Sequence, residues 1–170
     1  FGGTGNDTLI AASARTTKNS LIRGNSGRDD FTFGNINNSI INLNADDDVI
    51  VVNGAIKDGK IYGGRQNDSI YLNKSVANSL IRGDDDQDAI VVNGELSNSI
   101  VNGNNGSDQI TINSANISSS SIYGGKGSDN IDINSEAIYV NGGQNGDNIN
   151  LRSSKLHTVY GGRGDDTITA

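Results

Sequence analysis

The sequence contains no cysteine, proline, methionine or tryptophan, and its aromatic residues are limited to five tyrosines and three phenylalanines. The absence of cysteine excludes disulfides, thiol catalysis and cysteine-based zinc or iron–sulfur sites. Apolar residues make up 33% of the 170 residues, well below the roughly 45–50% of an ordinary globular domain. Too few large side chains are present to fill a thick, aromatic-rich core.

Long hydrophobic runs are absent as well. No stretch of about 18 apolar residues exists, so we expect no membrane span, and no basic segment precedes an apolar one, so we expect no signal peptide within this chain. The 20 acidic and 13 basic residues give a net charge of −7, which argues against nucleic acid as the main partner. Low hydrophobicity with negative charge is also typical of disorder, but the periodicity of the sequence argues against disorder here.

Glycine is abundant, with 23 residues, and many of them stand in a repeated motif that ends in aspartate. Residues 2–7, 124–129 and 161–166 are near copies of this motif, and weaker copies lie between them. The last residues of the copies, here called the repeat aspartates, are Asp7, Asp29, Asp48, Asp68, Asp88, Asp108, Asp129, Asp147 and Asp166. Their spacing varies only between 18 and 22 residues. A fixed period near 20 residues predicts a solenoid.

Apolar residues stand at fixed places relative to the repeat aspartates. Two places after them come Leu9, Phe31, Ile50, Ile70, Ile90, Ile110, Ile131, Ile149 and Ile168. Four places after come Ala11, Phe33, Val52, Leu72, Val92, Ile112, Ile133, Leu151 and Ala170, and seven places before come Ile22, Ile41, Ile61, Ile81, Val101, Ile122, Val140 and Val159. Alternation with period two and β-branched residues predicts strands, one after each aspartate and one before each Gly-rich turn.

Stacking such coils about 4.8 Å apart places equivalent residues above one another. We therefore predict an all-β fold, a right-handed parallel β-solenoid of about nine coils of about 20 residues, with a thin core of aliphatic columns. Residues 1–170 form a single solenoid segment in this interpretation. Because neither end resembles the cap that a solenoid needs, we expect the segment to belong to a longer array.

Asparagine recurs five places after the repeat aspartates, at Asn53, Asn73, Asn93, Asn113 and Asn134. We expect these side chains to face inward and to bond to their equivalents above and below, as stacked asparagines do. The alternative is that asparagine is merely compatible with a turn. The opposite side of the coil varies in length and composition, from residues 57–59 to residues 114–121, and is typical of solvent-facing turns.

The motif Gly-Gly-x-Gly-x-Asp followed by x-apolar-x resembles the calcium-binding nonapeptide of RTX proteins, and residues 2–10, 124–132 and 161–169 match it closely. The resemblance implies that calcium lies between stacked turns, bound by the repeat aspartates and by backbone carbonyls. Carried over by position, the carbonyl ligands four residues before each aspartate are Gly3, Asn25, Asn44, Gly64, Asp84, Asn104, Gly125, Gly143 and Gly162. Those two residues before are Gly5, Gly27, Asp46, Asp86, Gly106, Gly127, Asn145 and Gly164, with Gln66 departing from the pattern.

The residue types suit calcium chemistry independently of the resemblance. Calcium takes six to eight hard oxygens, which carboxylates and carbonyls supply, and turns that direct carbonyls inward need the positive φ that Gly, Asn and Asp tolerate best. A stack of carboxylates at strand spacing would also repel itself without cations. The alternative is a metal-free β-solenoid whose turns are simply tight.

We expect several calcium ions, up to about one for each gap between coils, along one edge only, because the motif stands on one side of the coil whereas RTX arrays usually carry it on both. Residues 44–48 lack glycine and residues 63–68 carry Gln66, so these are the least certain sites. Asp85 is expected to be solvated. Full occupancy would move the net charge from −7 to about +9.

No catalytic centre is predicted. His157 is the only histidine, so a Ser–His–Asp set would depend on this one residue in a variable turn. The carboxylates repeat in register, whereas a catalytic pair would break the repeat. We therefore expect no enzyme activity.

The residues that are predicted to face outward do not exclude a function in binding a ligand or another chain. Eight places before the repeat aspartates come Leu21, Ile40, Lys60, Leu80 and Ile100, a partly apolar face that either marks contacts with other chains or is ordinary surface. Tyr62, Tyr123 and Tyr160 could stack on sugars or pack on neighbours. No regular threonine row is present, so ice binding is a minor alternative.

These observations favour a calcium-stiffened structural or adhesive segment of a large exported bacterial surface protein, such as a surface layer, filament or adhesin. The expected location is extracellular, with export by a type I route as the resemblance implies. The expected partners are calcium, further copies of the chain or of its coils, and a glycan. The alternative is a calcium-dependent secretion or folding module of a secreted enzyme, and a third class is an ice- or glycan-binding solenoid.

Overall fold

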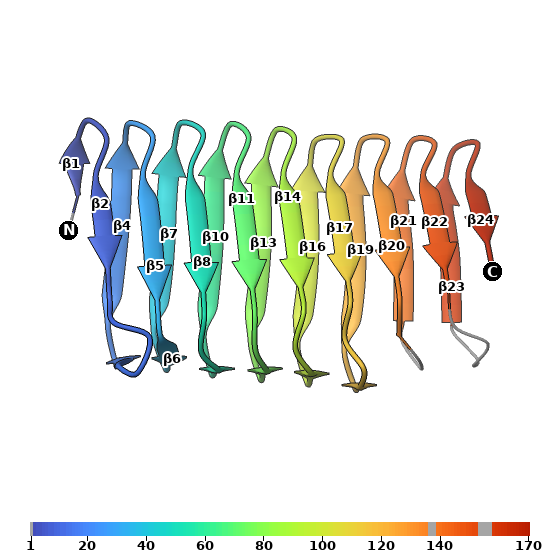
Figure 1. Cartoon of the computed structure of the whole chain (residues 1–170). Coiled ribbons are helices and arrows are strands. Elements are labelled where there is room, and N and C mark those ends of the chain that lie inside the picture. The colour runs from blue at the N-terminus through green and yellow to red at the C-terminus, as the bar shows by residue number, and fades with distance from the viewer. Residues whose placement is uncertain (1, 136–138, 153–157) are drawn as a thin grey trace.

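The computed structural model describes residues 2–135, 139–152 and 158–170. The chain is an all-β parallel solenoid of about eight turns, with the N- and C-termini at opposite ends (Figure 1). Nine aspartate registers delimit eight complete turns, which is why the number of turns is one below the nine coils predicted. The described residues form strands and turns only, so none of them builds a helix that could span a membrane.

Two long sheets of nine strands each form opposite walls of the solenoid. Sheet A precedes the Gly-rich turns and contains β1 (Gly3–Thr4), β4 (Leu21–Ser26), β7 (Ile40–Ala45), β10 (Lys60–Arg65), β13 (Leu80–Asp85), β16 (Ile100–Asn105), β19 (Ser121–Lys126), β21 (Tyr139–Gln144) and β23 (Thr158–Arg163). Sheet B follows the repeat aspartates and contains β2 (Thr8–Ile10), β5 (Asp30–Phe33), β8 (Val49–Val52), β11 (Ser69–Leu72), β14 (Ala89–Val92), β17 (Gln109–Ile112), β20 (Asn130–Ile133), β22 (Asn148–Leu151) and β24 (Thr167–Thr169). The two predicted strands of each coil are thereby confirmed.

Neighbouring coils pair in parallel and in register, as the repeat predicts. Ile61 pairs with Ile41 on one side and Ile81 on the other, and Ile90 pairs with Ile70 and Ile110. The three predicted apolar columns are buried over the middle of the solenoid. At the C-terminal end Ile168 is 47% exposed, because no further coil covers it in this chain.

A third, six-stranded sheet closes the remaining side of the solenoid and was not predicted. Sheet C contains β3 (Thr16–Lys18), β6 (Asn35–Asn37), β9 (Ile56–Lys57), β12 (Val76–Ala77), β15 (Leu96–Ser97) and β18 (Ile117–Ser118). These strands contribute a fourth buried column, made of Ile36, Ile56, Val76, Leu96 and Ile117. The variable side of the coil is therefore part of the core and not only a set of solvent-facing turns.

A serine row forms the corner between sheets C and A. The backbone N–H of Ser79 donates to Oγ of Ser99 at 3.1 Å, and the N–H of Ser99 donates to Oγ of Ser120 at 3.1 Å. Each hydroxyl in turn donates to a carbonyl two residues earlier in its own coil. The corner thus links coils through buried, fully used hydroxyl groups.

The asparagine column lies on the opposite corner, after sheet B. Its side chains are hydrogen-bonded from coil to coil as predicted, with Nδ2 of Asn93 donating to Oδ1 of Asn73 at 3.0 Å and Nδ2 of Asn113 donating to Oδ1 of Asn93 at 2.9 Å. The predicted inward orientation is wrong, because these bonds lie at the exposed surface. The strand alternation explains this, since the residue that follows an inward one points outward.

Candidate metal-binding column

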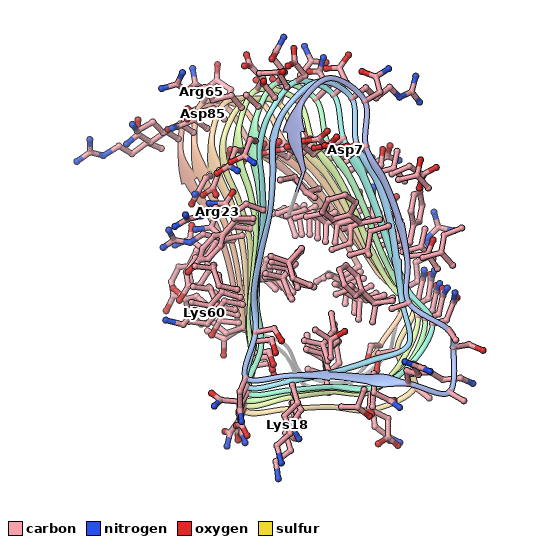
Figure 2. All side chains as sticks on the ribbon, turned by 90° about the vertical axis from the view of Figure 1, so that its left-hand side faces the viewer. Asp7, Lys18, Arg23, Lys60, Arg65 and Asp85 are labelled. Carbon is pink, nitrogen blue, oxygen red and sulfur yellow. The ribbon has the colours of Figure 1, made fainter. Side chains whose placement is uncertain are left out.

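The Gly-rich turns stack along one edge of the solenoid and hold the repeat aspartates beneath them. In the view along the axis, Asp7 lies inside the outline of the coil, whereas Arg65 and Asp85 lie outside it (Figure 2). From Asp29 to Asp147 each repeat aspartate is at most 2% exposed. The aspartates therefore form an interior column, not a solvated acidic edge.

The backbone of the turns has the conformation that the residue types predict. The residues two places before the repeat aspartates have positive φ in every turn, including Gln66 at 72°. Four places before, φ is positive from Asn25 to Gly162, whereas Gly3 is not in this region. The turn at residues 63–68 therefore has the same fold as its neighbours despite the glutamine.

One carboxylate oxygen of each aspartate links two coils. Oδ1 of Asp29 accepts from the backbone N–H of Asp7, Oδ1 of Asp48 accepts from Asp29, and the pattern continues to Asp166 with distances of 2.6 to 2.9 Å. Each carboxylate thus satisfies a buried N–H that no strand partner reaches. This structural role was not predicted from the sequence.

The other carboxylate oxygen is left without a partner. Oδ2 is buried and accepts no hydrogen bond at Asp7, Asp29, Asp48, Asp68, Asp88, Asp108, Asp129 and Asp147. A buried carboxylate oxygen without a partner is costly, so a column of such oxygens calls for a proton or a cation at each one.

A glycine stands five places before every repeat aspartate except Asp48, and its missing Cβ makes room for this free oxygen. A Cβ at Gly103 would lie closer than 3.0 Å to Oδ2 of Asp108 and to the carbonyl oxygen of Gly124 in the next coil. A Cβ at Gly63, Gly124 or Gly142 would likewise lie closer than 3.0 Å to Oδ2 of the aspartate five places later and to a carbonyl oxygen of the next coil. The first glycine of the motif is therefore required, because any side chain at this position would collide with both oxygens.

Further carbonyls point along the axis into the same gaps. A Cβ at Gly125 would lie closer than 3.0 Å to the carbonyl oxygen of Asn104, and one at Gly127 equally close to that of Gly106. The gap between the coils of Asp108 and Asp129 is therefore bordered by the carbonyls of Asn104, Gly106 and Gly124 and by the free oxygen of Asp108. The predicted carbonyl ligands and the predicted carboxylates thus border the same gap.

Burial and mutual repulsion raise the pKa values of the carboxyl groups. Desolvation is the main cause and raises the pKa of Asp108 to about 6. Neighbouring aspartates add to it at the others, so that the pKa is about 7 for Asp48 and Asp129 and about 8 for Asp68 and Asp88. The hydrogen bond from the backbone of the adjacent coil acts in the opposite direction. Without a cation, the buried repeat aspartates are therefore not all ionised near neutral pH.

The arrangement sets limits on how an ion could be held. Among the described residues, no three carboxylate or histidine side chains are grouped to hold a metal. Adjacent aspartates are one coil apart, about 4.8 Å, so an ion between two coils would contact at most two carboxylates. Carbonyls would have to supply most of the six to eight oxygens that calcium takes, and the carbonyls bordering each gap fit that requirement.

One turn fits less well than the others. Leu43 takes the place of the glycine beside Asp48, and its side chain is fully buried in the core. The turn at residues 44–48, which lacks glycine, therefore also lacks the free space next to its carboxylate. In the same turn, Oδ2 of Asp46 accepts from the N–H of Gly27 at 2.7 Å.

The remaining predicted residues lie apart from this column. Asp85 is exposed and accepts from Nδ2 of Asn105 at 2.7 Å, in agreement with a solvated role. Leu21, Ile40 and Ile100 are 55%, 38% and 42% exposed, so the partly apolar outer face of sheet A is confirmed. His157 lies outside the described residues.

Comparison with protein-family models, with curated proteins and with solved structures finds no match for this chain. The likeness to RTX repeats therefore depends on the sequence motif alone.

Proposed function

We propose that this chain is a calcium-binding structural and adhesive segment of a large exported bacterial surface protein, such as a surface layer, filament or adhesin. Calcium ions between the coils, along the edge of the repeat aspartates, would order and stiffen the solenoid. The proposal includes right-handed coils related to RTX repeats, the handedness being that of nearly all parallel strand crossovers.

The observation that carries the proposal is the free Oδ2 of each buried repeat aspartate. At Asp29, Asp68, Asp108, Asp129 and Asp147 it lies beside a glycine and a carbonyl oxygen of the next coil, whereas Leu43 takes the place of the glycine beside Asp48. A cation there would satisfy this oxygen and neutralise the column. The repeat aspartates would supply carboxylate ligands, and the turn carbonyls of residues such as Asn104, Gly106 and Gly124 would supply the rest.

The extracellular role follows from the metal. When the unfolded chain has no metal site, the free energy of calcium binding stabilises the folded state. A segment of this kind would therefore be less ordered inside the cell, where calcium is scarce, and would become rigid outside it, where calcium is abundant. A long, repetitive and rigid solenoid suits spacing or lattice functions better than catalysis. We propose that the segment has no enzyme activity of its own.

The second candidate is a calcium-dependent folding or secretion module attached to a secreted enzyme. The same column supports it equally, so the rest of the polypeptide distinguishes the two. An adjoining catalytic domain would favour the module, and many more repeats would favour the surface protein.

The test is calcium binding measured together with folding. In metal-free buffer we expect a weaker β signal by circular dichroism and a lower melting temperature, and calorimetric titration with calcium should give several binding events and restore both. Asp108→Asn should reduce the number of bound ions, whereas Asp85→Asn, which changes an exposed carboxylate, should not. A β signal and melting temperature unaffected by chelation, with no heat of calcium binding, would reject the proposal.

A further inference from the structure

The outer face of sheet A differs from the rest of the surface in its charge. Its residues stand eight and six places before the repeat aspartates and include the basic residues Arg23, Lys60 and Arg82 but no acidic residue. Arg23 and Lys60 project from this side of the coil (Figure 2). Its first half mixes aliphatic residues with these basic ones, and its second half consists mainly of tyrosine and asparagine.

A groove of about 470 Å³ crosses the second half of this face, over β16, β19 and β21. Its walls carry Tyr123, Lys126 and the amides of Asn102, Asn104, Asn105 and Asn141, and Gly125 and Gly143 line it without side chains. The repeat aspartates themselves do not line the groove, because their carboxylates are buried inside the coil. The groove and the candidate metal column therefore share the turn backbone of Asn104, Gly125 and Gly143 but not the carboxylates.

Three tyrosine rings form a row along the axis beside the groove. The ring centroid of Tyr139 lies 5.8 Å from that of Tyr123 and 5.7 Å from that of Tyr160, with interplanar angles of 53° and 47°. Aromatic rings that are partly exposed offer apolar faces next to polar edges. Such a row matches a ligand with apolar faces and many hydroxyl groups, which is the chemistry of a saccharide.

One amide in the groove has an unused acceptor. Oδ1 of Asn102 accepts from the backbone N–H of Asn104 at 3.1 Å, and Asn105 donates to Asp85. Oδ1 of Asn141, by contrast, is shielded from solvent and has no hydrogen-bond partner.

The charge around the groove favours an acidic ligand. Without the nine repeat aspartates, the chain carries 11 acidic and 13 basic residues. Lys126 lies in the groove and pairs with Gln144 of the next coil, which in turn pairs with Arg163. Arg163 is therefore two coils away from Lys126 at the same place of the repeat. The two cations are thus about 9.6 Å apart along the axis. Asp84 and Asp85 lie on the adjacent coil, and each accepts from an asparagine amide of the groove.

We propose that this groove binds an acidic glycan, with sugar rings against Tyr123 and its neighbouring tyrosines, hydroxyl groups on the asparagine amides, and carboxylates at Lys126 and Arg163. The inference rests on the proposed adhesive role, since it gives that role a ligand class. The two ligands would nevertheless contact different groups of these turns, calcium the carboxylates and backbone carbonyls, and the glycan the side chains of the outer face.

The test compares the binding of two hexasaccharides. Hyaluronan hexasaccharide is acidic and alternates glucuronate with N-acetylglucosamine, whereas chitohexaose is a neutral chain of N-acetylglucosamine. Titration calorimetry on the whole calcium-loaded chain should give binding of the acidic sugar and about tenfold weaker binding of the neutral one. Tyr123→Ala should weaken hyaluronan binding by about tenfold or more. Lys126→Gln should bring its affinity to that of chitohexaose.

The control is Tyr71→Ala, which removes a tyrosine that is 38% exposed on the outer face of sheet B and should leave binding unchanged. All variants should keep the parent's circular dichroism and calcium titration. The proposal is overturned if neither sugar binds, if both bind equally, if Tyr123→Ala has no effect, or if Tyr71→Ala weakens binding as much. Glycan binding by a chain that takes up no calcium would refute the proposed function and leave the groove assignment standing.

Discussion

At the scale of single residues, the glycine that stands five places before every repeat aspartate except Asp48 decides whether the carboxylate has room. A Cβ at Gly103 would collide with Oδ2 of Asp108 and with the carbonyl of Gly124. We expect Gly103→Ala to displace both oxygens, to remove one calcium site and to lower the melting temperature. Gly3→Ala is the matched control, because a Cβ there meets nothing within 4 Å. Equal calcium stoichiometry for the two variants would contradict this role of the glycine.

The residue scale also shows where sequence reasoning succeeded and failed. Positive φ at the turn positions could be predicted because only a few residue types tolerate it. The bond from the N–H of Asp7 to the carboxylate of Asp29 could not, because it joins residues of different coils and depends on which rotamer the packed core leaves open. The orientation of Asn93 was predictable from strand alternation and was nevertheless predicted wrongly.

At the scale of elements, sheet C was missed because its strands have only two or three residues. So short a strand places one side chain inward, and alternation cannot be recognised from one residue. The signal lies in the register instead, because Ile36, Ile56, Val76, Leu96 and Ile117 all stand twelve places before a repeat aspartate. A column recurring at the period of the solenoid is evidence of burial even without alternation.

The burial of this column can be measured. Ile56 is 1% exposed, so Ile56→Ala should lower the free energy of unfolding by about 2–5 kcal/mol. Ile100 is 42% exposed on the outer face of sheet A, and Ile100→Ala should change it by about 0.5 kcal/mol or less. Chemical denaturation of both variants in calcium-replete buffer makes the comparison. Similar losses would mean that sheet C does not close the core.

At the scale of the whole molecule, the raised pKa values make the stability of the metal-free chain depend on pH. An unfolded aspartate has a pKa near 3.8, whereas the pKa is about 8 for Asp68 and Asp88 in the fold. The folded state therefore binds more protons between these values, and the stability that the protonated carboxyl groups contribute is complete below about pH 4 and is lost progressively as the pH rises to about 8. We expect the melting temperature of metal-free protein to fall over this range.

Calcium should reverse this trend, because it requires deprotonated carboxylates. Asp68→Asn should flatten the pH dependence of the metal-free chain, since a neutral amide needs no proton, whereas Asp85→Asn should not. Thermal unfolding between pH 4.5 and 8 provides the measurement. Rising stability of the metal-free chain toward pH 8 would mean that the column tolerates its charge.

The coil-to-coil bonds of the repeat aspartates all run in one direction, each N–H donating to the carboxylate that follows about 20 residues later in the chain. Any coil therefore presents the same acceptor to its predecessor and the same donor to its successor. It follows that duplication or deletion of one whole repeat preserves the coil-to-coil bonds at every junction, whereas an insertion within a strand would shift its side chains out of register with both neighbouring coils. Evolution can thus lengthen or shorten such a rod in unit steps without inventing a new interface.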